Sequence, residues 1–431
     1  MFVPFVFNMS TFSRAPFLWW FYNGLDFIKK TQSAIIAQEI YCDTPVSAFT
    51  AEGRAEAFNK AFVDEHWFYD LPKNSDLKNK RIYKIPDAVL NPIIRQKGSI
   101  SDAFCYLLSK PDETLCQFLD NLILQIEGEC GQSIEGFLTL MAIPSLTKAA
   151  SARGIPVIHF ELGCWREPIY LHTAFWDLED LQGGTSVEQR WDRFCRERER
   201  RDIPIFSKQE CLALLLAKKN LRMLNDYNRK PVKQIGAALG YTTYELVSHR
   251  THMNDSELLY RLREKYGIEN MLIRRHFGDP YGGQYPKYSE AMDKRGRNMP
   301  DFLLDCETVV SLISGTGMEA MLWNRKAITL LPSPSYYASG HELEGDGKCA
   351  GEDFISFFAF CYLIPLEYLT DVEYLRWRLT MPTEREIYFK HLEFYFKKKG
   401  ISTDLIFGAP GSRLDKMLSA QGVQMRGENE P

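Results

Sequence analysis

Several common signatures are missing from this 431-residue sequence. None of its ten cysteines stands in a C-x-x-C pair or a paired Cys/His spacing, which indicates reduced thiols instead of a zinc site or a disulfide scaffold. No Asp-x-Asp pair is present to hold a divalent ion against a diphosphate. No apolar run approaches the roughly 18 residues that a membrane-spanning helix needs. The net charge of -4 argues against a surface that binds duplex nucleic acid, because phosphate neutralisation dominates such binding.

What remains is the composition of a globular enzyme, with 45% apolar and 25% charged residues. The chain is too long for one core, so we expect two domains and a tail. We place a first domain at 1–230, a second domain at 231–385, and a helical tail at 386–431 that returns to the first domain. The expected location is cytoplasmic. The aromatic run from Trp19 to Tyr22 leaves open a peripheral contact with the inner membrane.

Alternating strand and helix patterns predict the fold class, which is α/β. "GFLTLMA" (136–142) and "IPVIHFELG" (155–163) are typical of strands, and the segment between them is typical of a helix closed by Gly154. A second series of strands and helices runs from "QIGAALGY" (234–241) to "KAITLL" (326–331). Short β-branched strands separated by helices favour parallel sheets covered on both faces. The charges of 186–202 predict a solvated helix.

The stretch "SLISGTGMEAMLWNRKAITL" (311–330) places two hydroxyls and two glycines where a strand meets a helix. The free N–H groups and the positive end of the helix dipole favour an anion there. We therefore predict a phosphate or carboxylate site at Ser314, Gly315, Thr316 and Gly317. A tight turn with a helix cap is the alternative interpretation. The stretch matches neither a P-loop nor a dinucleotide fingerprint.

Three polar residues stand at the end of the "IPVIHF" strand. His159 and Glu161 are two residues apart and share one face of the strand, while Arg166 follows in the loop. Ligands of open α/β sheets bind beyond the carboxyl ends of the strands, so Glu161 is a candidate general base. An ion pair between Glu161 and Arg166 would be structural instead. His159 fits a structural role equally well.

The segment "IRRHFGDP" (273–280) ends another predicted strand. Arginine binds phosphate through two parallel hydrogen bonds, which makes Arg275 and His276 candidates for a donor phosphate. Strand alternation predicts that either Arg274 or Arg275 points to solvent.

These segments carry a family resemblance. "VVSLISGTGMEAMLWNRKAITL", "RRHFGDP" and "IPVIHFELGCWREPIY" resemble, in order and spacing, three blocks of the GT-B glycosyltransferases that build bacterial capsule polysaccharide and lipopolysaccharide. The sequence is most similar to the Kdo (3-deoxy-manno-octulosonic acid) transferases with two Rossmann-like domains. The likeness spans roughly residues 135 to 335, and Phe277 stands where those enzymes have proline.

The resemblance implies a GT-B fold of two Rossmann-like domains, an acceptor-side domain at 1–230 and a nucleotide-sugar-binding domain at 231–385, with a cleft between them. It also implies a CMP-linked nonulosonate donor. The acceptor would be an oligosaccharide or a lipid-linked glycan. No metal and no other cofactor is implied. Glu161 would act on the acceptor hydroxyl beside Arg166 and His159. The donor would be bound by residues of the second half, namely Arg275, His276, Ser314, Gly315, Thr316, Gly317 and Glu319.

One departure and two alternatives remain. Retaining members of this group carry an aspartate nucleophile at the start of the second half, but here the first carboxylates are Glu245 and Asp255, so retention and inversion both stay open. A UDP-sugar transferase or a sugar-nucleotide epimerase would share the fold and the anion site. "VKQIGAALGYTTYELVSH" (232–249) also resembles a helix-turn-helix DNA reader, although its reading helix would lack the expected basic residues.

The missing Asp-x-Asp pair leads to a prediction about metals. We expect glycosyl transfer to survive EDTA unchanged, because a helix N-terminus and arginines can neutralise the donor without Mg²⁺. The measurement is turnover in EDTA, with and without added Mg²⁺ or Mn²⁺. A loss of turnover that either ion restores would contradict the metal-free assignment.

Overall fold

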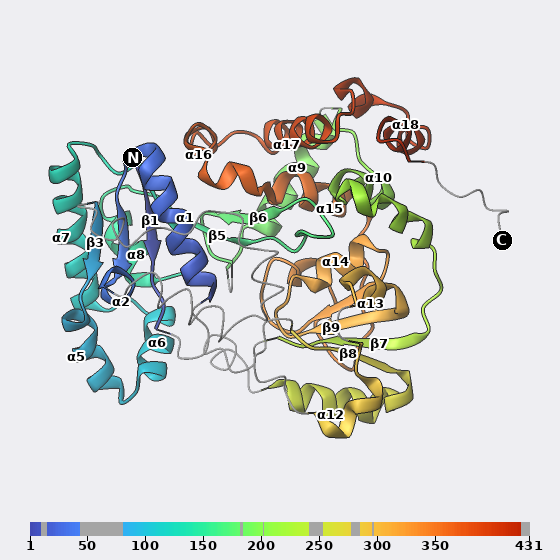
Figure 1. Ribbon diagram of the computed structural model, residues 1–431, viewed down its shortest axis with the longest axis horizontal. Helices are drawn as coiled ribbons and strands as arrows, with labels where there is room; N and C mark the ends of the chain where they lie inside the picture. The colour runs from blue at the N-terminus through green and yellow to red at the C-terminus, as the bar shows by residue number, and fades with distance from the viewer. Residues whose placement is uncertain are drawn as a thin grey trace.

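The computed structural model contains two mainly parallel β-sheets, each covered by its own helices (Figure 1). It describes residues 1–9, 15–43, 81–181, 184–200, 202–240, 253–276, 285–294 and 297–423. In Figure 1 the N-terminal sheet and its helices are blue to cyan, the second sheet lies on the other side of the molecule, and the C-terminal helices run along the top in red. The two-domain α/β architecture of the GT-B class is confirmed.

The first sheet has seven strands in the order β11-β6-β5-β4-β1-β2-β3. Its strands are β1 (Phe2–Val6), β2 (Ile35–Gln38), β3 (Ile82–Ile85), β4 (Gly136–Thr139), β5 (Val157–Leu162), β6 (Thr173–Asp177) and β11 (Ile364–Pro365). Strands β1 to β5 are parallel, whereas β6 runs antiparallel to both β5 and β11. Every residue of β1, β2 and β4 is buried, as expected for parallel strands covered on both faces.

Helices cover the first sheet on both faces. They are α1 (Ala15–Thr31), α2 (Glu39–Asp43), α5 (Asp87–Lys97), α6 (Ile100–Ser109), α7 (Glu113–Cys130) and α8 (Pro144–Ser151). Local signals set their ends. In α7 the Asp112 side chain accepts a hydrogen bond from the Leu115 N–H, and Gly131 ends the helix with φ of 63°.

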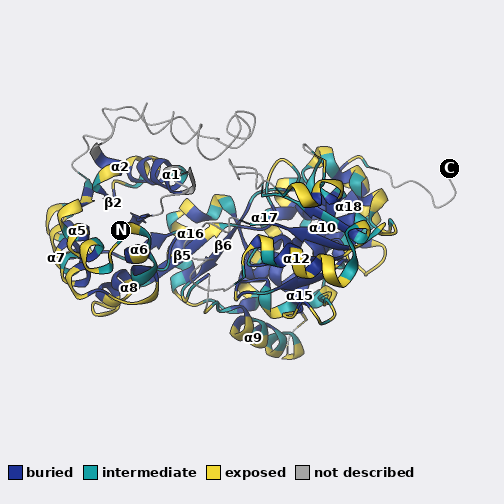
Figure 2. Cartoon of the chain, turned by 90° about the horizontal axis from the view of Figure 1, so that it is seen from below, coloured by how far each residue is buried: buried dark blue, intermediate teal, exposed yellow. Residues whose placement is uncertain are grey.

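The second sheet has four parallel strands in the order β10-β9-β7-β8. These are β7 (Lys233–Ala238), β8 (Met271–Arg274), β9 (Cys306–Ser311) and β10 (Lys326–Thr329), with helices α12 (Asp255–Tyr266), α13 (Met299–Asp305) and α14 (Thr316–Leu322). One face packs under α12. The other joins a large core that also contains the C-terminal helices. Figure 2 shows buried residues running through this part of the molecule, while the outer side of α9 is exposed.

A helical layer joins the two sheets. It consists of α9 (Val187–Arg200), α10 (Lys208–Leu215), α15 (Glu352–Phe357), the π-helix η6 (Phe358–Tyr362), α16 (Val372–Leu379), α17 (Glu384–Lys399) and α18 (Arg413–Ala420). Short 3₁₀ turns complete the fold at η2 (Lys218–Asp226), η3 (Ile268–Asn270), η4 (Pro286–Ala291), η5 (Tyr336–Ala338), η7 (Leu366–Thr370) and η8 (Thr403–Phe407). The chain returns to the first sheet at β11, which is earlier than the tail boundary predicted at residue 386.

Most predicted strands and helices of both halves are confirmed, with three corrections. The sequence "SAIIAQEIYC" (33–42) suggests a helix that leads into a strand, but the structure has a strand followed by a helix there. Strand β6 was not expected, because "TAFWD" has no flanking helical period. The segment proposed as a DNA reader contains β7, an interior strand of the second sheet, and this excludes the helix-turn-helix interpretation. Residues 51–80 and 241–252 lie outside the described residues.

The aromatic N-terminal segment belongs to the core. Trp20, Phe21 and Tyr22 of α1 are at most 1% exposed, so these rings are not available to a membrane surface. Among the described residues, no helix combines the length and the apolar character required to cross a bilayer. No disulfide joins any of the ten cysteines, all of which lie within the described residues, as the sequence predicted.

Buried ion pairs hold the helical layer together. On α9, Arg190 donates to Glu384 of α17 at 3.0 Å and to the Cys361 carbonyl at 2.7 Å. The prediction of a fully solvated charged face on α9 is therefore wrong at Arg190, which is 4% exposed. Arg413 forms a second buried pair with Glu210 at 2.8 Å. Buried charges require such partners, since an isolated one is costly.

We expect Arg190→Ala to lower the free energy of unfolding by about 3 kcal/mol, because the buried carboxylate of Glu384 then keeps only the partly exposed Arg193 as an ion-pair partner. Lys397→Ala, which removes an exposed pair with Glu393 on the same helix, is the control and should cost at most about 1 kcal/mol. Denaturant titration measures both. Equal losses of unfolding free energy in the two variants would show that the buried pair contributes no more than the exposed pair.

The same pair predicts a pH dependence. Burial raises the pKa of Glu384, but Arg190 outweighs it and lowers the pKa to about 2. The unfolded carboxyl takes up its proton at higher pH than the folded one, so the stabilisation is present above the unfolded pKa and is lost as the pH falls toward 2.

Candidate functional site

The predicted acceptor-side residues lie at the carboxyl end of β5, where the chain turns into the antiparallel strand β6. The turn is tight: a Cβ at Gly163 would lie 2.1 Å from the Thr173 hydroxyl, and the Gly163 N–H donates to the Thr173 carbonyl at 2.8 Å. The Thr173 hydroxyl donates to the Trp165 carbonyl at 2.8 Å. Only glycine fits at position 163, and these hydrogen bonds fix the conformation of the loop that follows. We call residues 163–172 the β5–β6 loop.

The β5–β6 loop contacts the start of α14 in the other half. A Cβ placed on Gly315 would lie 2.9 Å from the Cβ of Cys164. Farther along the loop, the Tyr170 hydroxyl donates to Glu319 Oε1 at 2.8 Å. The structure therefore brings Glu319 and Gly315 of the predicted donor side against the loop that carries Arg166.

For the Ser-Gly-Thr-Gly turn the sequence leaves two interpretations open, an anion site and a capped turn, and the turn has the hydrogen bonds of a cap. The Ser314 hydroxyl accepts from the Thr316 N–H at 3.2 Å and lies 2.7 Å from the Thr316 hydroxyl, as in a capping turn. A Cβ at Gly317 would lie 2.9 Å from the Thr329 hydroxyl. Packing alone explains both glycines, because Gly315 faces Cys164. A substitution at Gly315 would therefore test the contact between the two halves as much as ligand binding.

The two arginines at the end of β8 differ in their contacts. Arg274 is anchored, with Nη1 donating to Asp293 at 2.7 Å and Nη2 to the Arg297 carbonyl at 2.7 Å. The Nε of Arg275 is buried and has no hydrogen-bond partner among the described residues. Arg275 is the better candidate for binding a ligand. Phe277 lies outside the described residues.

His276 follows at the same sheet edge. Burial, together with the nearby charge of Arg166, lowers its pKa to about 3. The imidazole is therefore neutral near pH 7 and can offer a phosphate a hydrogen bond, but not a full positive charge.

Glu161 is an exposed carboxylate beside a large mass of protein. The surrounding protein raises its pKa, and Arg166 opposes that shift. The charge of Arg166 acts on Glu161, so both predicted roles of Glu161, a general base and an ion-pair partner of Arg166, stay predictions. A carboxylate with a raised pKa that remains open to solvent suits a general base.

Glu319 is 6% exposed, and burial raises its pKa to about 7. The hydrogen bond from Tyr170 and the charges of Arg166 and Arg274 oppose that shift. Its carboxyl group is consequently poised to change protonation near neutral pH, which is typical of functional sites.

His159 lies behind this surface. It is 2% exposed and pairs in register with Asp177 of β6, whose carboxylate accepts hydrogen bonds from Tyr362 and the Ser186 N–H. Burial lowers the pKa of His159 against the opposing charges of Asp180 and Asp177. The position favours the structural one of its two predicted interpretations.

Nothing in the sequence selects three further residues of this region, which are Cys164, Tyr170 and Trp323. All three belong to segments that carry the family resemblance, but each has a partner about 150 positions away along the chain. No periodicity or motif carries that pairing.

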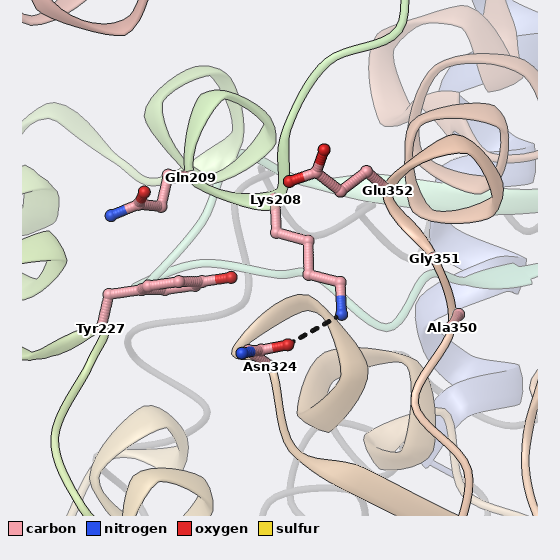
Figure 3. Close-up of a pocket in the computed structure, with 7 residues that line it drawn as sticks. All are labelled: Lys208, Gln209, Tyr227, Asn324, Ala350, Gly351 and Glu352. Atoms are coloured by element: carbon pink, nitrogen blue, oxygen red, sulfur yellow. Dashed lines mark hydrogen bonds between the residues drawn. The ribbon is translucent and has the colours of Figure 1, made fainter. Parts of the chain in front are cut away.

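A polar pocket of about 320 Å³ lies at the far end of α14 (Figure 3). Lys208 crosses it and donates to Asn324 at 3.1 Å, while the ring of Tyr227 and the carboxylate of Glu352 flank it. None of the predicted site residues lines this pocket. Within the described ranges, no three His, Cys, Asp or Glu side chains gather closely enough to ligate a metal ion.

The two α/β halves have the GT-B type of architecture, and comparison with known proteins supports a glycosyltransferase. Residues 2–186 match the Glycosyltransferase 99 family N-terminal domain. No curated protein sequence matches the chain.

Solved structures show weak similarity. The beta Kdo 2,7 transferase KpsC of Thermosulfurimonas dismutans is 14% identical, with 60% of this chain and 89% of that chain covered and a TM-score of 0.35. UDP-GlcNAc 2-epimerase from Neisseria meningitidis is 12% identical, with 92% and 99% covered and a TM-score of 0.32. Os79 from O. sativa in complex with UDP is 9% identical, with 97% and 100% covered and a TM-score of 0.33. At these scores the similarities assign no substrate.

The environment of Glu161 leads to a prediction. Glu161→Gln should reduce turnover by about 10²- to 10⁴-fold, the usual contribution of general acid–base catalysis, while nucleotide affinity and melting temperature stay near those of the parent. Steady-state kinetics, nucleotide titration and thermal unfolding measure the three quantities. Arg166→Ala is measured alongside, because a structural pair would make both variants lose stability together. Full turnover in Glu161→Gln would remove this residue from the mechanism.

Proposed function

We propose that this protein transfers an acidic nonulosonate sugar from a CMP-linked donor to a hydroxyl group of a bacterial surface glycan. Kdo is the first candidate for that sugar. The family match of residues 2–186 supports the glycosyltransferase class. The donor, the acceptor and the absence of a metal requirement are parts of the proposal. A growing capsule polysaccharide or lipopolysaccharide, held at the inner face of the cytoplasmic membrane, would be the acceptor.

The observation that carries the proposal is the position of Arg166. Its charge affects the pKa of Glu161 on the acceptor side and the pKa values of His276 and Glu319 on the donor side. One arginine thus lies within electrostatic range of both halves of the predicted site. A donor with a phosphate and a carboxylate carries two negative charges, and this is the kind of ligand that such a site favours.

The other residues take roles that follow from their surroundings. Arg275 would bind the phosphate or the sugar carboxylate, because its guanidinium lacks a partner among the described residues. His276 would add a neutral hydrogen bond, and the hydroxyls of Ser314 and Thr316 would add two more. Gly315 and Gly317 allow this turn to pack. The carboxylate of Glu319 suits hydroxyl groups of the nucleotide ribose.

Glu161 would remove the proton from the acceptor hydroxyl as its oxygen attacks the anomeric carbon of the sugar and CMP leaves. Its raised pKa makes it a stronger base than an ordinary carboxylate. His159 would support it from behind. Such a displacement needs no protein nucleophile. Asp255, one of the two alternatives, is buried in the first turn of α12, and Glu245 lies outside the described residues.

The donor class can be tested by thermal unfolding with CMP, UDP and GDP. A nucleotide at 100 times its Kd should stabilise the folded protein by about 2.7 kcal/mol. We expect CMP to raise the melting temperature and the other two to leave it unchanged. A shift with UDP alone would overturn the CMP assignment and favour a UDP-sugar enzyme.

A further inference from the structure

A chain of three buried side chains crosses from the β5–β6 loop into α14. The indole N–H of Trp323 donates to the Tyr170 hydroxyl at 2.7 Å, and that hydroxyl donates to Glu319 Oε1 at 2.8 Å. Tyr170 is 1% exposed and Trp323 is fully buried. Tyr170 belongs to one half of the molecule, whereas Trp323 and Glu319 belong to the other. The contact is therefore both a hydrogen-bond relay and a junction between domains.

We propose that Tyr170 is a positioning residue for donor binding: it fixes the Glu319 carboxylate at the start of α14 and couples that carboxylate to the acceptor-side loop. The identity of the donor in this statement rests on the proposed function. The coupling of Tyr170 to Glu319 does not.

The direction of the two hydrogen bonds is fixed by chemistry. An indole N–H can only donate, so it occupies a lone pair of the Tyr170 oxygen. The single phenolic proton is then committed to Glu319, which must accept. Among the described residues, the side-chain hydrogen bond to Glu319 comes from Tyr170 and reaches Oε1, not Oε2. One carboxylate oxygen is held by Tyr170, and the other remains able to accept from a ligand hydroxyl.

The ionisable groups around Glu319 come from both halves. Arg166 and Cys164 face it from the β5–β6 loop, and Arg274 faces it from β8. Burial raises the pKa of Tyr170 well above its usual value, so the phenol keeps its proton and remains a donor. Loss of the phenol would remove an influence that lowers the pKa of Glu319, and that pKa should rise above about 7.

The loop geometry explains how coupling would arise. The Tyr170 N–H donates to the Arg166 carbonyl at 3.0 Å, so the two residues belong to one turn. A shift of this turn moves Arg166 relative to Glu161 and moves the Tyr170 hydroxyl relative to Glu319. The acceptor-side arginine and the donor-side carboxylate are positioned by the same ten-residue loop.

The first test compares Tyr170→Phe with Tyr83→Phe. Both changes remove a phenol that donates to a carboxylate at 2.8 Å, but Tyr83 donates to Glu129 at the far edge of the first sheet. We expect CMP affinity to fall about tenfold in Tyr170→Phe, the usual weight of a hydrogen bond to a charged group, and to stay unchanged in Tyr83→Phe. Parental CMP affinity in a folded Tyr170→Phe protein would overturn the positioning role.

The second test needs no nucleotide. Glu319 holds its proton in the folded state up to about pH 7 but releases it near 4.5 when unfolded, so its contribution lowers stability as pH rises through that window. In Tyr170→Phe this fall should extend to higher pH, and in Glu319→Gln it should disappear. Adding Tyr170→Phe to Glu319→Gln should then lower the melting temperature by the same amount at every pH. A pH-independent offset in Tyr170→Phe alone would reduce Tyr170 to a packing residue.

The two tests separate the inference from the proposed function. If the parent protein does not bind CMP, the donor assignment fails, whereas the pH profiles of the unliganded variants still decide whether Tyr170 controls Glu319. If CMP binds and the pH profile of Tyr170→Phe equals that of the parent, the donor assignment stands and the coupling is wrong.

Discussion

The contact between the β5–β6 loop and the start of α14 is the constraint on which the site depends. Gly163 allows the loop to fold back on Thr173, and Gly315 allows Cys164 to approach the turn before α14. Both glycines are required by close packing, with no appeal to unusual backbone angles. Because the loop follows a strand of the first sheet and α14 follows a strand of the second, this contact sets the position of one sheet edge against the other.

The helical layer keeps that contact in place. Trp165 of the loop packs edge-on against Phe358 at 6.0 Å, and Phe175 of β6 packs against the same ring at 6.3 Å. The π-helix that carries Phe358 leads directly into β11, which extends the first sheet. The buried pairs Arg190–Glu384 and Arg413–Glu210 tie the surrounding helices to one another. The C-terminal region thus belongs to the interdomain core and is more than a tail.

Three titratable side chains of the candidate site differ in how they bind protons. Glu161 remains accessible, Glu319 is buried near its titration point, and His276 stays neutral. Arg166 lies within electrostatic range of all three. The backbone of Arg166 is held by the loop turn, in which its carbonyl accepts from the Tyr170 N–H.

The sequence by itself determined the alternating strands and helices of both halves, because hydrophobic period, helix caps and glycine stops act over a few residues. It also indicated where β5, β8 and β9 end, and therefore which polar residues lie at sheet edges. It could not determine that Arg274 is anchored while Arg275 is not, that β6 runs antiparallel, or that Tyr170 reaches Glu319. Those features depend on contacts between residues far apart in the chain, and only the packing of the two halves decides them.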